Sequence, residues 1–272
     1  MLGHDLARVF ADTKPTCWDC NDLDITDKTA VFKKIGELKP TVVVNAAAYT
    51  DVDGAETEIN KERALTINGT AVGYLAEVCG KLGAILVHYS TEYVFDGTKK
   101  DGYVEGDPVC PVNVYGESKA LGEKLLQQNC EMFYLIRSSW LYGKAPQAGK
   151  PRGMNFVQTM LKLAETQKEI RVVNDQFGKP TYAADLATET RKLIESQKPC
   201  GIYHITNDGV CTWYDFAKKI FEIKGIGVTV KPIPSEEYPT PTPRPKYAVL
   251  QNTKLELMRD WEKALKEYLE SI

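Results

Sequence analysis

Tyr115 and Lys119 are the two residues of this sequence whose types and spacing best suit acid–base chemistry. Four positions apart on a helix, their side chains would lie on one face, about one turn from each other. An ammonium group held near a phenol favours the phenolate and therefore lowers the pKa of the tyrosine. A tyrosine that exchanges its proton near neutral pH can act as a general acid or base. The plain alternative is a pair of side chains on the surface of a helix.

Strand-like and helical segments alternate around this pair. Strands are expected over 41–44, 84–89 and 132–136, and helices over 28–36, 62–81 and 114–128. The strand segments are largely apolar, and 41–44 is mostly β-branched, as in strands buried on both faces of a parallel sheet. This alternation predicts an α/β fold with a doubly wound, Rossmann-like parallel sheet.

The residues that follow these strands are expected to meet at one edge of the sheet. Ligands of doubly wound sheets bind at the carboxyl ends of the strands. The predicted strands place 45–48, 90–91 and 138–140 at that edge. We therefore expect Thr91 to lie beside the helix that carries Tyr115, with a strand-end cap as its alternative role.

The second half of the chain has a different pattern of residues, which predicts a smaller α/β domain. We expect a dinucleotide-binding domain over 1–143, completed by strands near 170–205. Residues 144–272 would mainly form a substrate domain. Prolines crowd the segment 232–245, which is therefore expected to be an extended loop.

The composition is that of an ordinary globular chain, with 43% hydrophobic and 26% charged residues among 272. A formal net charge of -3 gives no reason to expect nucleic acid or an anionic membrane as a partner. No apolar run approaches the roughly 18 residues of a membrane span, and no signal peptide is visible, so we expect a cytoplasmic protein. The seven cysteines are scattered, and Cys17 and Cys20 lack a second ligand pair, so neither disulfides nor a metal site is expected.

Several segments resemble the extended short-chain dehydrogenase/reductases, and within them the dTDP-4-dehydrorhamnose reductase branch. In order they are NAAAYTDVD at 45–53, STEYVFDG at 90–97, YGESK at 115–119, RSSWLYG at 137–143, VNDQFGKPT at 173–181, WYDFA at 213–217 and RP at 244–245. A lone Tyr-x-x-x-Lys is a weak signal. This ordered set covers nearly the whole chain and is highly specific.

The resemblance implies an oxidoreductase that uses NADH or NADPH to reduce the C4 ketone of dTDP-4-dehydro-6-deoxy-L-mannose (dTDP-4-dehydrorhamnose) to dTDP-L-rhamnose. Tyr115 would give its proton to the forming alkoxide. Lys119 would lower the pKa of Tyr115 and hydrogen-bond the nicotinamide ribose. Thr91 would hydrogen-bond the same carbonyl oxygen as charge develops. A homodimer is compatible with this function.

The resemblance nominates cofactor-binding residues near the start of the chain, after the first buried strand and on the catalytic helix. They are Gly3, Asp24, Ile25, Ala46, Ala47, Ala48, Tyr49, Tyr115 and Lys119. Asp19 follows a short predicted strand over 16–18 and is placed to accept a hydrogen bond from the ribose 2′-OH. That contact would favour NADH over NADPH by charge repulsion. A solvated turn is the alternative for Asp19.

The resemblance also nominates residues for the nucleotide sugar. They are Thr91, Glu92, Trp140, Asn155, Gln176, Thr181 and Arg244. Arg244 suits a diphosphate because its guanidinium presents a fork of donors. For Trp140 the alternative is a place in a domain interface. The three histidines, His4, His88 and His204, are expected to be structural.

The sequence departs from the family pattern in two places. Glu92 stands where the family has aspartate, which lengthens the side chain by one methylene. The family begins with a strand and a Gly-x-x-Gly-x-x-Gly loop, of which Met1-Leu2-Gly3 resembles only the tail. Those glycines let the backbone approach the pyrophosphate. We expect a misplaced start or a truncated sequence; the alternative is a natural chain with impaired folding or cofactor binding.

Two other functions stay open on the sequence. One is a nucleotide-sugar epimerase or dehydratase of the same superfamily. The other is a non-catalytic regulatory or binding subunit with the same fold. The segments 49–53 and 175–181 favour the reductase over the first. The joint presence of Thr91, Tyr115 and Lys119 argues against the second.

Overall fold

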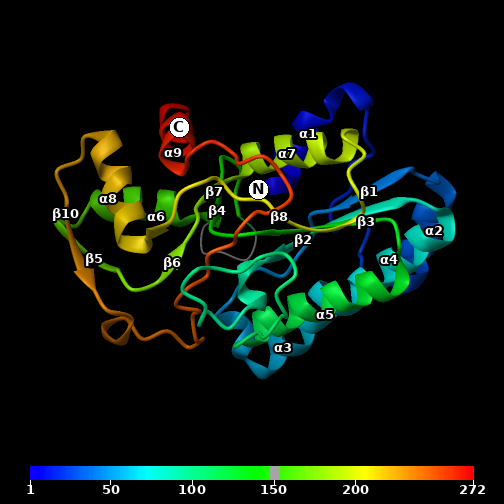
Figure 1. Ribbon diagram of the computed structural model, residues 1–272, viewed down its shortest axis with the longest axis horizontal. Helices are drawn as coiled ribbons and strands as arrows, with labels where there is room; N and C mark the ends of the chain where they lie inside the picture. Colours follow the sequence, from blue (N-terminus) through cyan, green and yellow to red (C-terminus); the bar gives the residue numbers. More distant parts are fainter. Residues whose placement is uncertain (148–152) are drawn as a thin grey trace.

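The computed structural model describes residues 1–147 and 153–272. Its helices and strands are α1 (Leu2–Val9), α2 (Lys28–Leu38), β1 (Val42–Asn45), α3 (Glu58–Leu65), α4 (Ala71–Leu82), β2 (Ile85–Thr91), α5 (Val114–Asn129), β3 (Phe133–Ser138), β4 (Leu141–Tyr142), α6 (Phe156–Ala164), β5 (Glu169–Val173), β6 (Phe177–Gly178), β7 (Thr181–Tyr182), α7 (Ala183–Glu195), β8 (Gly201–His204), β9 (Cys211–Thr212), α8 (Trp213–Lys224), β10 (Thr229–Ile233) and α9 (Trp261–Glu270). Figure 1 shows a sheet between helices on one side of the molecule, and α6, α8 and shorter strands on the other.

Four parallel strands form the central sheet, in the order β1-β2-β3-β8. The register pairs Asn45 with His88 and Thr91 with Ser138, so the carboxyl ends of these strands share one edge. The predicted α/β fold with a parallel sheet is confirmed. β8 reaches this sheet from a distant part of the chain, whereas β5 pairs with β10 in a separate two-stranded sheet.

Helices cover both faces of the central sheet (Figure 1). On one face, α2, α4 and α5 enclose an apolar cluster that includes Val31, Leu86 and Leu126. On the other face, α1 and α7 enclose a second cluster with Leu6 and Leu186. Each helix turns an apolar stripe to the sheet, and the burial of these stripes is the main force that holds the layers together.

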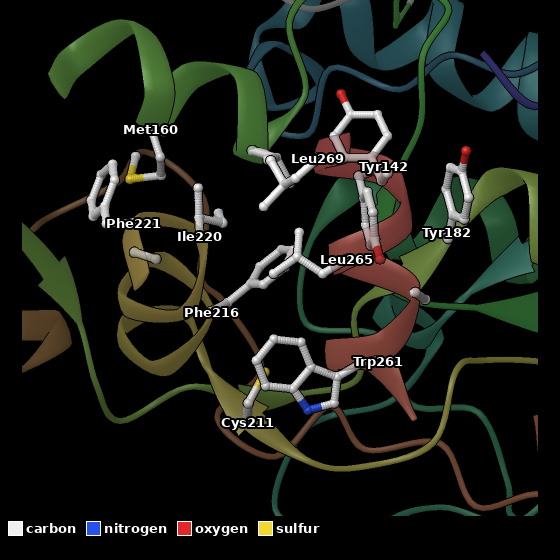
Figure 2. Close-up of a cluster of buried hydrophobic side chains, with 14 of the residues drawn as sticks. Tyr142, Met160, Tyr182, Cys211, Phe216, Ile220, Phe221, Trp261, Leu265 and Leu269 are labelled. Carbon is white, nitrogen blue, oxygen red and sulfur yellow. The ribbon is translucent and has the colours of Figure 1, made fainter. Parts of the chain in front are cut away.

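A further apolar cluster lies away from the central sheet and joins α6, α8 and α9 (Figure 2). Phe216 of α8 meets Trp261 of α9 edge-on, with ring centroids 5.6 Å apart. Tyr142 of β4 lies at the same separation from Phe216. Because Trp140 and Trp213 immediately precede β4 and begin α8, this cluster also sets the positions of these two tryptophans.

The strand predicted over 16–18 is wrong. Residues 11–22 are exposed, and 16–18 pair with no strand in the part of the chain that the structure describes. A strand forms only where a neighbour can bond its N–H and C=O groups. β1 is the edge of the central sheet and does not pair with this segment.

The helix predicted over 62–81 is divided into α3 and α4 by a π-helical turn over Thr66–Thr70. The buried amide of Asn68 projects from this turn. It accepts a hydrogen bond from the Tyr49 N–H (2.9 Å) and donates to the Tyr49 carbonyl (3.0 Å) and to Ser118 Oγ (2.9 Å). A buried amide is stable only when its groups are paired. The turn therefore ties the loop after β1 to α5.

A buried ion pair fastens α5 to β3. Arg137 donates from Nε and Nη2 to the two carboxylate oxygens of Glu123 at 2.9 and 2.7 Å, and both side chains are 2% exposed. Ser90, near the end of β2, donates to the same carboxylate at 2.5 Å. These contacts hold the helix at a fixed height against the strand ends.

Glu123→Ala should lower the free energy of unfolding by about 3–5 kcal/mol, because Arg137 would keep a buried charge without its partner. Urea denaturation followed by circular dichroism measures the change. Glu165→Ala is the control: Glu165 pairs with Lys162 at 2.5 Å with both side chains exposed, and its removal should cost less than about 1 kcal/mol. Equal losses in the two variants would contradict the prediction.

Candidate active site

Tyr115 and Lys119 lie in the first turns of α5, beside the carboxyl end of β2. Asn113 begins this helix, and its side chain accepts a hydrogen bond from the Gly116 N–H at 2.8 Å. Gly116 allows a close approach, because a Cβ there would lie 2.2 Å from the Tyr93 carbonyl oxygen. The helix predicted over 114–128 is thus confirmed, and its start is pressed against the segment that follows β2.

Tyr115 lies beside Thr91, and its ring meets that of Tyr93 edge-on at 5.5 Å. Burial raises the pKa of Tyr115, and the carboxylate of Glu92 raises it further. The spacing had predicted a pKa lowered by Lys119. That direction is wrong here, because burial disfavours the phenolate more than its neighbours favour it. Tyr115 therefore keeps its proton at neutral pH, as a proton donor must.

Lys119 is buried, with its amine against β2. Its Nζ atom donates to the Tyr89 carbonyl at 2.6 Å and lies 3.5 Å from His88 Nε2. Burial lowers the pKa of Lys119 to about 8, against the opposing effect of Glu123 one turn along the helix. Both protonation states of this amine are therefore accessible close to neutral pH.

Glu92 is a buried carboxyl at the end of β2. Thr91 Oγ1 donates to Glu92 Oε2 at 2.7 Å. Burial raises the pKa of Glu92 to about 7, although the Thr91 hydrogen bond and the charge of Arg244 favour the carboxylate. Thr91 thus donates its hydrogen bond to Glu92 and lies beside Tyr115.

Four of the residues predicted to bind the substrate line one small cavity next to this edge. The cavity is lined by Glu92, Tyr93, Trp140, Gln176, Trp213, Arg244, Pro245 and Ala248. Trp140 stacks on Trp213 with ring centroids 3.6 Å apart and planes 11° from parallel. The cavity therefore joins an aromatic stack to a guanidinium, a pair of groups suited to a ring and an anion.

Arg244 is already ion-paired within the protein. Its Nη2 donates to both carboxylate oxygens of Asp53 at 2.8 Å, and its Nη1 donates to Tyr93 Oη at 3.3 Å. The Arg244 side chain is 16% exposed and that of Asp53 is 40% exposed. A partly exposed pair of this kind holds the guanidinium in place and can exchange its partner for another anion.

Three residues predicted to bind the substrate, Thr91, Asn155 and Thr181, are not among those that line this cavity. Asn155 is buried and begins α6, where its amide donates to the Gly143 carbonyl at 2.8 Å. Thr181 is fully buried in β7. The structure gives these side chains partners within the protein, and a role in binding the substrate stays a prediction for all three.

Five of the residues predicted to bind a cofactor, Gly3, Ala46, Ala47, Ala48 and Tyr49, lie at the start of α1 or directly after β1. A Cβ on Gly3 would lie 4.0 Å from the Cβ of Ala46. Ala46, Ala47 and Ala48 follow β1 directly, and the Ala47 N–H donates to Asn45 Oδ1 at 3.1 Å. Tyr49 comes next and is held at its backbone by the π-helical turn.

A second cavity, of about 470 Å³, lies between the loop before α2 and the helix α3. It is lined by Cys20, Asp24, Thr26, Ile59, Glu62, Arg63, Thr66 and Ile67. Asp24 is the only cofactor candidate among these lining residues, and Ile25 is its half-buried neighbour. Asp19 lies in an exposed turn, where its carboxylate accepts a hydrogen bond from the Asn21 N–H at 2.7 Å.

Several residues that the structure brings to these sites had no predicted role. Tyr93, Trp213 and Asp53 surround the guanidinium of Arg244 or the tryptophan stack, and Arg63 lines the larger cavity. Asp53 and Trp213 fall in segments that matched the family, which was a usable signal. Their contacts join distant segments and leave no trace in local spacing.

Two absences concern metals and membranes. Residues 1–147 and 153–272 hold no group of three or more His, Cys, Asp or Glu side chains that could bind a metal ion. In the same residues, no helix combines the length and the apolar character needed to cross a membrane.

Comparison with known proteins gives consistent results. The family model of the RmlD substrate binding domain matches residues 1–272. Spore coat polysaccharide biosynthesis protein SpsK of Bacillus subtilis is 44% identical over 91% of this chain and 85% of its own length. The dTDP-4-dehydrorhamnose reductase of Burkholderia thailandensis is 40% identical over 93% and 88%. The crystal structure of the Bacillus anthracis dTDP-4-dehydrorhamnose reductase in complex with NADP superposes with a TM-score of 0.92 at 36% identity, covering 100% of this chain and 95% of that one.

Glu92→Gln should make the stability of the protein less dependent on pH. The folded state keeps the proton of Glu92 up to about pH 7, whereas an unperturbed glutamate loses it near 4.5. Between these values the folded state binds more protons, so the free energy of unfolding falls as the pH rises. At 1.36 kcal/mol per pKa unit, this group lowers the stability of the wild type by about 3 kcal/mol across the interval.

Urea unfolding of wild type and variant at about pH 5 and about pH 8 measures this difference. Glu236→Gln, which removes an exposed carboxyl, should leave the pH dependence of the wild type intact. The prediction fails when Glu92→Gln loses stability between the two pH values as steeply as the wild type.

Proposed function

This chain belongs to the RmlD substrate binding domain family, and we propose that it reduces the C4 ketone of dTDP-4-dehydrorhamnose to give dTDP-L-rhamnose, with NADH or NADPH as the cofactor. The observation that carries this proposal is the assembly of Thr91, Tyr115 and Lys119 at one buried edge of the sheet. The cavity beside that edge holds Arg244 and the tryptophan stack, which suit a nucleotide diphosphate and a ring.

The residues present fit a nicotinamide dinucleotide. The cavity beside Asp24 has room for an adenosine group. The buried amine of Lys119 offers donors to a ribose. Ser138 Oγ, in register with Thr91, is buried and has no hydrogen-bond partner among the described residues. A polar ligand group at this edge would satisfy it.

Tyr115, Thr91 and Lys119 have separate roles in the reduction of the ketone. A reduced nicotinamide, when bound, would supply the hydride for the C4 carbon. Tyr115, protonated at neutral pH, gives its proton to the oxygen that becomes the alkoxide. Thr91 holds the same oxygen by a hydrogen bond as negative charge develops. Lys119 hydrogen-bonds the nicotinamide ribose and, when protonated, stabilises the phenolate left on Tyr115.

We assign substrate binding to the cavity next to this edge. Arg244 would bind the diphosphate, which would replace Asp53 as the partner of the guanidinium. Trp140 would pack against a ring of the substrate. Glu92 and Gln176 would hydrogen-bond its polar groups. Asn155 and Thr181 remain candidates through the family resemblance alone.

We further propose that residues 1–143 mainly bind the cofactor and residues 144–272 mainly bind the substrate. The two regions of Figure 1 support this division. β8 crosses it, because this strand from the second part completes the central sheet. A homodimer and a cytoplasmic location are also part of the proposal. Sedimentation analysis and cell fractionation test them.

Tyr115→Phe should fold normally and lower kcat by about 100-fold or more, because it removes the proton donor and leaves the ring in place. Oxidation of NADPH in the presence of the 4-keto sugar nucleotide measures turnover, and quenching of cofactor fluorescence measures binding. The control is Tyr74→Phe, which removes a hydroxyl on α4, outside the catalytic edge. Turnover of Tyr115→Phe near that of the wild type would exclude Tyr115 as the donor.

Asp19→Asn should shift the preference between the two cofactors toward NADPH by several-fold in kcat/KM, because a carboxylate near the ribose repels the 2′-phosphate. The shift is measured as the ratio of kcat/KM values for NADH and NADPH. Glu37→Gln removes an equal charge from the exposed face of α2 and should leave the ratio unchanged. An unchanged ratio in Asp19→Asn would remove Asp19 from the cofactor site.

A further inference from the structure

His88 is a buried histidine on β2 that touches Lys119, and the proposed chemistry has given it no role. It is 0% exposed. Its Nε2 lies 3.5 Å from Lys119 Nζ, and its Nδ1 lies 3.1 Å from Nδ2 of Asn45, its register partner on β1. The imidazole therefore bridges the end of β1 and the catalytic helix.

The backbone fixes the orientation of the Asn45 amide. The Ala47 N–H can only donate, and it meets Asn45 Oδ1 at 3.1 Å. The other end of this amide, Nδ2, is also only a donor, and it faces His88 Nδ1. His88 Nδ1 must therefore accept. A neutral imidazole has one N–H and one lone pair, so the proton of His88 lies on Nε2.

His88 is held in the neutral form. Burial lowers its pKa well below the usual value, and the charge of Lys119 lowers it further. The Nε2–H consequently points at the amine of Lys119. An N–H donor meets the lone pair of a neutral amine favourably, whereas it offers nothing to an ammonium group.

The other groups around Lys119 do not all favour the same protonation state of its amine. On its own helix, Tyr115 lies one turn before it and Glu123 one turn after it, and the charge of Glu123 favours the ammonium. Arg137 of β3 offsets that charge through its ion pair with Glu123. From β2, the Tyr89 carbonyl accepts an N–H from the amine whether or not the amine is charged.

We propose that His88 is a positioning residue whose tautomer, fixed by Asn45, presents Nε2–H to Lys119 and weakens the hold of this amine on its proton. The proposal rests on the proposed function only for its effect on turnover. It connects the loop of Ala47, which belongs to the proposed cofactor site, to the charge of the catalytic lysine through two buried side chains.

The hydrogen bonds that join Asn45, His88 and Lys119 have a second state, in which donors and acceptors are exchanged. A charged Lys119 can donate to Nε2 only when the His88 proton moves to Nδ1. Nδ1–H would then need Asn45 Oδ1 as its acceptor, and the Ala47 N–H would lose that oxygen. The hydrogen bond from the Ala47 N–H to Asn45 Oδ1 therefore favours the neutral form of the Lys119 amine.

Nuclear magnetic resonance tests the proposal without any need for turnover. Long-range ¹H–¹⁵N spectra of protein labelled at its three histidines report which nitrogen of His88 carries the proton, with His88→Asn identifying its signals. We expect the proton on Nε2. A proton on Nδ1 in the wild type overturns the proposal; the variant serves only to assign the signals.

Titration of Lys119 supplies the second test. The ¹³Cε resonance of Lys119, assigned by its loss in Lys119→Arg, should titrate about one pKa unit higher in His88→Gln, whose amide oxygen can turn to the ammonium. His88→Asn is the matched variant: it can still accept from Asn45 but is too short to reach Lys119, and its shift should be smaller. Equal Lys119 pKa values in the wild type and in folded His88→Gln overturn the proposal.

Kinetics separates this proposal from the proposed function. The basic limb of the kcat/KM profile against pH should move upward in His88→Gln in step with the Lys119 titration. A shifted titration in a protein that never reduces the sugar nucleotide would refute the proposed function and leave the role of His88 standing. An unshifted Lys119 titration together with normal turnover would refute the role of His88 and leave the proposed function standing.

Discussion

The close approach of α5 to the carboxyl end of β2 is the constraint on which the active edge depends. Gly116 makes it possible, because a Cβ there would lie 2.2 Å from the Tyr93 carbonyl oxygen. Gly122 lets α5 pack equally closely on the π-helical turn, because a Cβ there would lie 2.1 Å from the Asn68 carbonyl oxygen. At that distance the Lys119 amine reaches the Tyr89 carbonyl. The ion pair of α5 with β3 then keeps the helix from sliding along the sheet. A larger residue at either glycine would collide with a backbone carbonyl and displace α5.

The same close packing determines how protons are held. Thr91, Glu92 and Lys119 are buried at this edge, and burial is the leading cause of the raised pKa values of Tyr115 and Glu92 and of the lowered pKa of Lys119. Each shift favours the neutral form of its group. The edge therefore holds a protonated phenol, a carboxyl whose pKa is about 7 and an amine whose pKa is about 8, a set that suits the delivery of a proton to a forming alkoxide.

These features mark the limit of what the sequence could predict. Runs of apolar residues indicated the strands around Thr91, and the four-residue spacing placed Tyr115 and Lys119 on one helical face, because both are local properties. The strand at 16–18 failed because pairing depends on a distant neighbour. The direction of the Tyr115 pKa failed for a related reason: spacing reports which charges are near, whereas desolvation depends on everything that packs around the group. The Arg244–Asp53 pair spans 191 residues and was equally out of reach of local spacing.

The substrate side is organised on a different principle from the catalytic edge. Trp140 has a φ of 46°, a left-handed conformation that is uncommon for a bulky residue. It lies on Trp213 and against Gly178, where a Cβ would come within 2.4 Å of its ring. Arg244 is likewise held by Asp53. Both groups thus have internal partners of the same chemical kind as the proposed ligand, a ring and an anion. A ligand that replaces these partners gains only the difference between the two sets of contacts. Binding of the proposed ligand at this cavity would therefore be an exchange of partners, whereas the groups of the proposed catalytic edge already lie together.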